Sequence, residues 1–165
     1  MTSSALSKRV EWAVIIVTMA VGATMVASSW TIPRGVGNER FSPRNAVDSV
    51  PAAIAAQPVF NDIEVGGYLI SRQIKPYIDT RLELYGRSTA EAYYKLVDGR
   101  DEQAILSEIE KWGAVWTLFP PSNRVNDVMA RQSAWCRHFG DDVAVVYIRR
   151  DVLEAAKWEC ANRAR

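Results

Sequence analysis

Polar and charged side chains gather where two short apolar runs of the chain end. They are Asn61, Asp62 and Glu64 at the run 58–61, and Asp79 and Arg81 at the run 75–79. If the two runs are neighbouring parallel strands, these side chains meet at the carboxyl edge of a sheet, where open α/β sheets bind ligands. Carboxylates there could hold a hard cation or accept hydrogen bonds from sugar hydroxyls, and an arginine could bind a phosphate or carboxylate.

Two glycines and a tyrosine complete the candidate binding site. The backbone amides of Gly66 and Gly67 could approach an anion closely, and Tyr85, which precedes Gly86 in an expected loop, could stack on a sugar ring. The candidate ligand-binding residues are therefore Asn61, Asp62, Glu64, Gly66, Gly67, Asp79, Arg81 and Tyr85.

The same residues also have a structural explanation, which we favour. Asn61 and Asp62 are residue types that form turns, the glycine pair can supply positive φ angles, and Asp79 can pair with Arg81. Other aromatic residues that could contact a sugar fall mostly at core-facing positions, where packing is the expected role. These are Tyr68, Tyr77, Tyr93, Tyr94, Trp112, Trp116 and Trp135.

The sequence gives little support for a site that uses a thiol, an imidazole or a metal ion. Cys136 and Cys160 are the only cysteines, they form no CxxC motif, and His138 is the only histidine. We expect no metal site and no cofactor, because too few ligands are present. We also expect two separate buried thiols rather than a disulfide, although outside the cytoplasm the pair could oxidise.

Helical and strand patterns alternate along the part of the chain that must position these residues. Helices are expected at 42–54, with a kink or restart at Pro51, and at 88–99, 101–112, 122–135 and 151–162; strands are expected at 58–61, 75–79, 114–119, 137–139 and 143–149. This order predicts a layered α/β domain with a mostly parallel sheet of four or five strands and an antiparallel hairpin at its C-terminal end.

An apolar segment precedes this domain. Trp12 to Trp30 comprises 19 residues without a charge, and a helix of that length spans about 28 Å, close to the hydrocarbon thickness of a bilayer. Tryptophans at both ends favour a transmembrane helix over a secretory signal peptide. The expected organisation is a tail and membrane helix (1–30, with 12–30 in the bilayer), a linker (31–41) and a domain (42–165).

Charge excludes one class of partner. The chain has 20 basic and 19 acidic residues and a formal net charge of +1, so it has no strong overall field to attract a phosphate backbone, and we expect no nucleic-acid binding. Basic residues flank the apolar segment on both sides, so counting them does not predict its orientation.

Several short motifs occur in a characteristic order between Ser42 and Arg150. They are Val-Phe-Asn-Asp at 59–62, Gly-Gly-Tyr-Leu at 66–69, Ile-Asp-x-Arg at 78–81, Leu-Tyr-Gly at 84–86 and Trp-x-Leu-x-Pro at 116–120. In this order the chain resembles the C-terminal extracytoplasmic domain, with the last membrane helix, of bacterial GT-C-type polytopic glycosyltransferase-like membrane proteins. It departs from their pattern at Ile63, where an aromatic residue is common, and at Thr80, where glycine is usual.

The resemblance implies a single-pass protein of the cell inner membrane with its domain on the periplasmic or extracellular side. Its implied partners are the lipid bilayer, through Trp12 to Trp30, a polytopic membrane partner or a missing N-terminal part, and a glycan or polyprenyl-phosphate sugar. Such enzymes keep their catalytic acid in a loop between N-terminal membrane helices, and no residues before Trp12 could supply that loop. We therefore expect a noncatalytic domain of, or derived from, such a protein. The alternative is a membrane-tethered, metal-dependent hydrolase or phosphotransfer enzyme that uses Asp62, Glu64 and Asp79.

Overall fold

The computed structural model describes residues 12–22, 24, 37–98 and 100–160, and it divides into two units, Met1–Val36 and Gly37–Arg165. In the first unit, residues 12–22 are helical and exposed. Among the described residues, no helix is both long enough and apolar enough to cross a membrane. Residues 23 and 25–30 of the expected membrane helix, and 31–36 of the expected linker, lie outside the described part of the chain.

The second unit is a mixed α/β domain built on a four-stranded sheet. Its strands are β1 (Val59–Asn61), β2 (Trp116–Phe119), β3 (Trp135–Gly140) and β4 (Val145–Arg149), in the order β1-β2-β4-β3. β1 pairs in parallel with β2, whereas β4 is antiparallel to both of its neighbours. The prediction of a mostly parallel sheet is therefore wrong. The predicted C-terminal hairpin is confirmed, but its second strand enters the sheet beside β2 instead of remaining at the edge.

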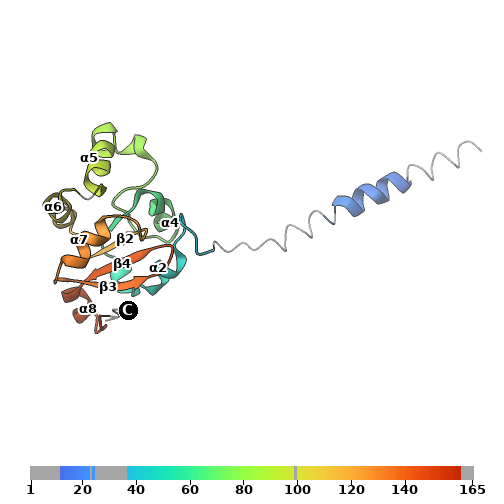
Figure 1. Ribbon diagram of the computed structural model, residues 1–165. Coiled ribbons are helices and arrows are strands. Elements are labelled where there is room, and N and C mark those ends of the chain that lie inside the picture. Colours follow the sequence, from blue (N-terminus) through green and yellow to red (C-terminus); the bar gives the residue numbers. More distant parts are fainter. Residues whose placement is uncertain (1–11, 23, 25–36, 99, 161–165) are drawn as a thin grey trace, which may run out of the picture. The chain divides into compact units, whose positions relative to one another are not determined.

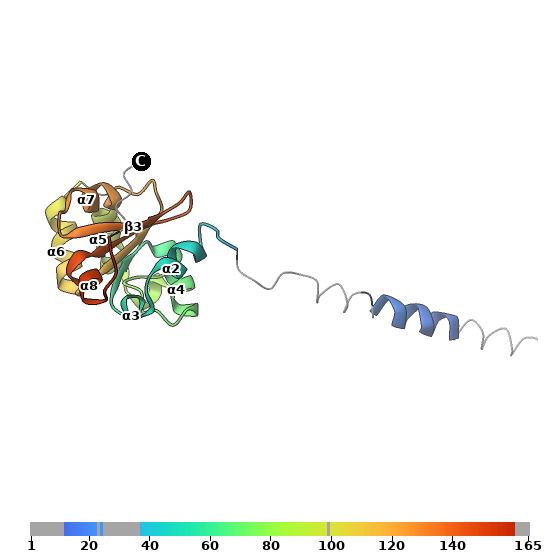
Figure 2. The same cartoon turned by 90° about the horizontal axis from the view of Figure 1, so that it is seen from below.

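Helices cover both faces of the sheet (Figure 1, Figure 2). One face packs against α2 (Arg44–Ser49), α3 (Ala52–Ala55), α4 (Gly66–Ser71) and α8 (Arg150–Ala155), and the other against α6 (Glu102–Trp112) and α7 (Val125–Arg131). Side chains of β2 alternate between these cores: Trp116 and Leu118 belong to the first, and Phe119 to the second. This alternation is the two-residue period of a strand buried on both faces.

A smaller core holds α5 (Arg87–Val97) beside the loops that follow β1. Buried Tyr93 packs with Ile63 and Ile78, and its hydroxyl accepts a hydrogen bond from the Ile63 amide at 2.9 Å. Two short 3-10 helices, η1 (Ile63–Val65) and η2 (Leu82–Leu84), lie in these loops. This third cluster fixes the loops from which the candidate site is built.

Most predicted helices form, with corrected ends. The restart at Pro51 is confirmed, and Asp101 caps α6 by accepting a hydrogen bond from the Ala104 amide. α7 ends at Arg131 rather than 135, and α8 ends at Ala155 rather than 162. The Gly66-Gly67 pair does not form a turn with positive φ, because Gly66 begins α4 with a φ of −57°.

The predicted strand 75–79 does not form. The segment contains Pro76, which has no N–H to donate, and its neighbours bond to a side chain instead of to a strand. The amide of Tyr77 donates to Asn61 Oδ1, and the carbonyl of Ile78 accepts from Asn61 Nδ2. The apolar character of the run reflects a buried loop.

Cys136 and Cys160 form a disulfide, so the expectation of two separate thiols was wrong. The chain reverses after α8, where Lys157 has a φ of 59° and the Trp158 amide donates to the Leu153 carbonyl. This reversal brings Cys160 back to β3, which carries Cys136. The bond therefore ties the segment after α8 to an edge strand of the sheet.

Candidate functional site

Asn61, the last residue of β1, organises the predicted site. Its side chain is fully buried. Its Nδ2 donates to the carbonyls of Ile78 (2.9 Å) and Asp62 (2.7 Å), while its Oδ1 accepts from the Tyr77 amide at 2.8 Å. The two groups of candidate residues are thus neighbours, as predicted, but a side-chain bridge joins them where strand pairing was expected.

The carboxylate of Asp79 is committed to partners within its own loop. Its Oδ1 accepts from the Arg81 amide (2.8 Å) and Arg81 Nε (2.9 Å), and its Oδ2 accepts from Arg81 Nη2 and the Tyr85 hydroxyl, both at 2.8 Å. Hydrogen bonds from Arg81 outweigh desolvation and hold the pKa of Asp79 well below its usual range. The predicted ion pair is confirmed, and Tyr85 belongs to the same cluster.

The two glycines begin α4. The amide of Gly66 donates to the Ile63 carbonyl, which leaves it no free donor for an anion. Gly66 is buried against Ile78 and Asp79, whereas Gly67 is exposed. Gly66 starts α4 and allows the loop of Ile78 and Asp79 to pack closely against it.

Asp62 and Glu64 lie in a separate polar cavity of about 700 Å³ at the carboxyl ends of β1 and β2, which also includes Arg40, Asn123 and Arg124. Asp62 Oδ1 accepts from the Glu64 amide at 2.9 Å and caps η1. Glu64 binds Arg40 through two contacts of 2.6 and 3.0 Å. Burial raises the pKa of Asp62, against the hydrogen bond from the Glu64 amide.

The three acidic residues of the alternative enzyme hypothesis therefore have separate partners. Asp62 bonds to the Glu64 amide, Glu64 pairs with Arg40, and Asp79 pairs with Arg81. Within residues 12–22, 24, 37–98 and 100–160, no group of three or more His, Cys, Asp or Glu residues could hold a metal ion. The convergence that metal-dependent catalysis requires is not found there.

A second cavity of about 740 Å³ lies between the loop 74–81 and α6. We call it the aromatic cleft. Its lining includes Lys75, Tyr77, Asp79, Arg81, Tyr85, Glu108, Lys111 and Trp112. Of the predicted site residues, this cleft is lined by Asp79, Arg81 and Tyr85, whereas the other cavity is lined by Asp62 and Glu64.

Contacts with neighbouring groups fix the aromatic rings of this cleft. Trp112 Nε1 donates to the carbonyl of Val59 at 3.1 Å, and the Trp112 ring meets Tyr77 edge to face, with centroids 5.5 Å apart. The Tyr77 hydroxyl donates to Glu108 Oε1 at 3.0 Å. Both rings are half-buried, so each has one part anchored in the protein and another part accessible.

Two charged side chains border these rings. Lys111 Nζ contacts Glu108 at 3.2 Å, and Lys75 Nζ lies 5.2 Å from the centroid of the Trp112 ring. Sequence reasoning did not identify Lys75, Glu108 or Lys111 as site residues, and it assigned Tyr77 and Trp112 mainly to packing. The spacing of Glu108, Lys111 and Trp112 on one helix was the available signal, because residues three and four apart share a helix face.

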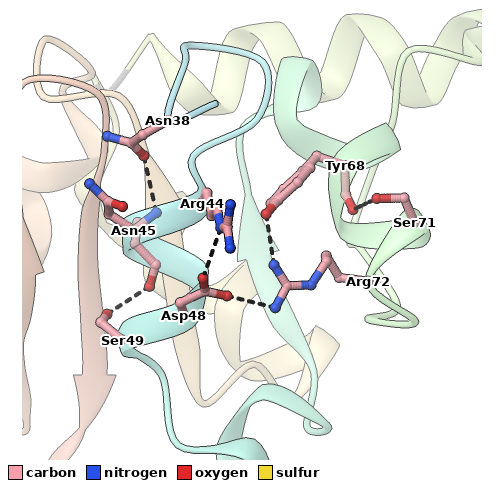
Figure 3. A network of polar contacts seen from close by, with 9 residues as sticks. Asn38, Arg44, Asn45, Asp48, Ser49, Tyr68, Ser71 and Arg72 are labelled. Carbon is pink, nitrogen blue, oxygen red and sulfur yellow. Dashed lines mark hydrogen bonds and ion pairs between the residues drawn. The ribbon is translucent and has the colours of Figure 1, made fainter. Parts of the chain in front are cut away.

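A further charged network joins α2 to the C-terminal end of α4 (Figure 3). Asp48 accepts from Arg72 Nη2 at 2.6 Å and from Arg44 Nε at 3.3 Å, and Arg72 Nη1 donates to the Tyr68 hydroxyl. Hydrogen bonding from Arg72 lowers the pKa of Asp48. Asp48 thus joins two arginines, Arg44 of α2 and Arg72 at the end of α4, which suits a structural role.

His138 and Cys136 do not form a nucleophile pair. The sulfur of Cys136 is bonded to Cys160, and His138 Nε2 lies 2.8 Å from the carbonyl of Ser49. The histidine ring also contacts Trp158 edge to face. These contacts give His138 a packing role between α2, β3 and the C-terminal segment.

Comparisons of the chain with protein-family models, with curated proteins and with solved structures found no match.

Proposed function

We propose that this chain is a noncatalytic extracytoplasmic domain, attached to the membrane by residues 12–30, which binds a glycan in the aromatic cleft. The observation that carries the proposal is the fixed, half-buried Tyr77 and Trp112 pair beside Lys75, Glu108 and Lys111. The C–H face of a sugar ring packs well on an aromatic ring, and its hydroxyls bond to polar groups at the ring's edge. The cleft offers both kinds of contact together.

The size of the cleft suits a short glycan. Its volume of about 740 Å³ lies within the range of roughly 300–1,000 Å³ that is usual for small-molecule sites. Its rings need little reordering before a ligand binds, because Trp112 and Tyr77 already have hydrogen-bond partners. Preorganisation of this kind reduces the entropy cost of binding.

The acidic groups of the cleft support binding over catalysis. Hydrolysis of a glycosidic bond commonly needs two carboxyl groups that flank the bond. Asp79 is held by Arg81 and Tyr85, and Glu108 is held by Lys111 and Tyr77. Neither carboxylate is presented to the cleft without partners.

The disulfide supports an extracytoplasmic location, because such bonds persist in oxidising compartments and are rare in the cytosol. The uncharged sequence from Trp12 to Trp30 supports the membrane attachment. A polytopic membrane protein in the same bilayer is the proposed partner, as the resemblance to glycosyltransferase-like proteins implies.

The binding proposal is tested with the full chain in detergent, applied to an array of oligosaccharides and then titrated by calorimetry with those that bind. Trp112→Leu should weaken binding by about 30-fold, since a central aromatic anchor contributes about 2 kcal/mol. Trp158→Leu is the matched control, because Trp158 is an exposed tryptophan that does not line the cleft.

Equal effects of the two substitutions, or no binding to any oligosaccharide, would contradict the proposed site. Circular dichroism of each variant verifies that the fold is kept. Turnover of a bound glycan by the purified chain would show that the noncatalytic part of the proposal is wrong.

A further inference from the structure

We infer that the glycan of the aromatic cleft carries a negative charge, which Lys75 recognises. This inference rests on the proposed function, because it specifies the ligand of the same site. The shared chemistry is a sugar ring with an anionic substituent, either a carboxylate or a phosphate.

The charges that line the cleft do not balance. Two carboxylates, Asp79 and Glu108, face three cations, Lys75, Arg81 and Lys111. Arg81 pairs with Asp79 at 2.8 Å, and Lys111 pairs with Glu108 at 3.2 Å. These two pairs leave the charge of Lys75 without a carboxylate among the described residues.

Lys75 is placed where it can meet a ligand. Its side chain is exposed, and its ammonium lies over the Trp112 ring, 5.2 Å from the centroid. A cation held on an aromatic face at an exposed site is only weakly bound. Lys75 is therefore an exposed and weakly held positive charge next to the ring on which a sugar would stack.

Binding of a sugar to that ring has different consequences for neutral and anionic ligands. A ring that stacks on this face of Trp112 takes the place of the Lys75 ammonium, so the cation–π contact is lost. A neutral sugar gives Lys75 no charged partner in return. A carboxylate or phosphate at the edge of the sugar gives Lys75 a charged partner, because the flexible lysine side chain can turn its ammonium toward that group.

The test is calorimetry of the full chain with two matched pairs of probes: cellobiose with cellobiuronic acid, and glucose with glucose 1-phosphate. In low salt, the anionic member of at least one pair should bind about fivefold more tightly, and this preference should shrink as salt screens the charges. The pair that shows the preference identifies the anionic group.

Three variants assign the preference to a residue. Lys75→Gln should remove it, so that the anionic and neutral members of a pair then bind with similar affinities. Lys75→Arg should retain a preference. Lys95→Gln, which removes an exposed lysine of α5 that does not line the cleft, should change nothing.

Two results would overturn the inference and differ in what they mean for the proposed function. If neutral and anionic sugars bind equally, or if Lys75→Gln keeps the preference, charge recognition by Lys75 is wrong while glycan binding stands. If none of the four probes binds, and the oligosaccharide array gives no ligand, both proposals are wrong.

Discussion

Gly66 at the start of α4 lies directly against the backbone of Asp79. A Cβ atom added to Gly66 would be 2.6 Å from the Cα of Asp79, closer than real side chains allow, whereas a Cβ added to Gly67 would meet nothing within 4 Å. The close approach positions the loop that carries Asp79 and Arg81 beside the helix. A backbone contact thus sets one wall of the aromatic cleft.

Gly66→Ala should destabilise the domain by roughly 2–3 kcal/mol, because the added methyl group overpacks a rigid contact with backbone atoms. Gly67→Ala is the control, and it should be neutral or stabilising by up to about 1 kcal/mol, since alanine is the better helix former. Urea unfolding of the two variants measures both changes. Similar losses of unfolding free energy for the two would show that the contact has no special importance.

The stability of the domain should depend on Asp79 in the acid range. Because the pKa of Asp79 is lower in the folded chain, its carboxylate stabilises the fold above the unfolded pKa of roughly 3.9, and this contribution is lost as the pH falls toward the folded value. Asp79→Asn should therefore cost about 2 kcal/mol at pH 7. The cost should shrink below about pH 4.

Asp62 should have the opposite effect. Burial raises its pKa in the folded chain, so the fold gains stability as the pH falls from neutral through that pKa. Asp62→Asn keeps an oxygen that can accept from the Glu64 amide and removes the buried charge. This variant should be at least as stable as the wild type at pH 7. Unfolding midpoints measured from pH 3 to pH 8 compare both variants, and equal losses for Asp62→Asn and Asp79→Asn at pH 7 would contradict this account.

The disulfide should contribute substantially to stability. Cys136 and Cys160 are 24 residues apart, and a loop of that length stabilises a fold by about 3.5 kcal/mol through restriction of the unfolded chain. Reduction should lower the unfolding free energy of the wild type by that amount. It should have no effect on the variant in which both cysteines are replaced by alanine.

The same bond provides a test of location. In cells, a maleimide reagent that adds measurable mass should label neither cysteine until the protein has been reduced. Labelling of both thiols without reduction would remove the main support for an extracytoplasmic domain.

Local signals account for the elements that were predicted well. The hairpin of β3 and β4, strand β2 before Pro120 and the start of α6 after Asp101 each depend on residues close together in sequence. The strand expected at 75–79 failed because buried apolar residues look alike in a strand and in a loop, and only tertiary structure shows that Asn61 supplies the hydrogen bonds. The pairing of β4 with β2 likewise depends on tertiary packing, which local sequence does not show.

The candidate site was predicted in part for the same reason. Asp79 and Arg81 were identified because they follow an apolar run, and Tyr85 because it precedes Gly86 in an expected loop. The rest of the cleft comes from α6, and the pairing of Trp112 with Tyr77 depends on how that helix packs across the sheet edge. Cys160 could not be paired with Cys136 from sequence, because the pairing depends on the chain reversal at Lys157.

The most direct measurement of glycan binding in the aromatic cleft is the indole N–H spectrum of the ¹⁵N-labelled full chain during titration with cellobiuronic acid and cellobiose. The chain has six tryptophans. The indole N–H signal that is absent from the spectrum of Trp112→Phe belongs to Trp112. We predict that the Trp112 signal shifts with ligand, because its ring forms the wall of the cleft, while the signals of buried Trp116 and Trp135 stay in place. Shifts confined to other tryptophans, or no shift at saturating sugar, would contradict the account.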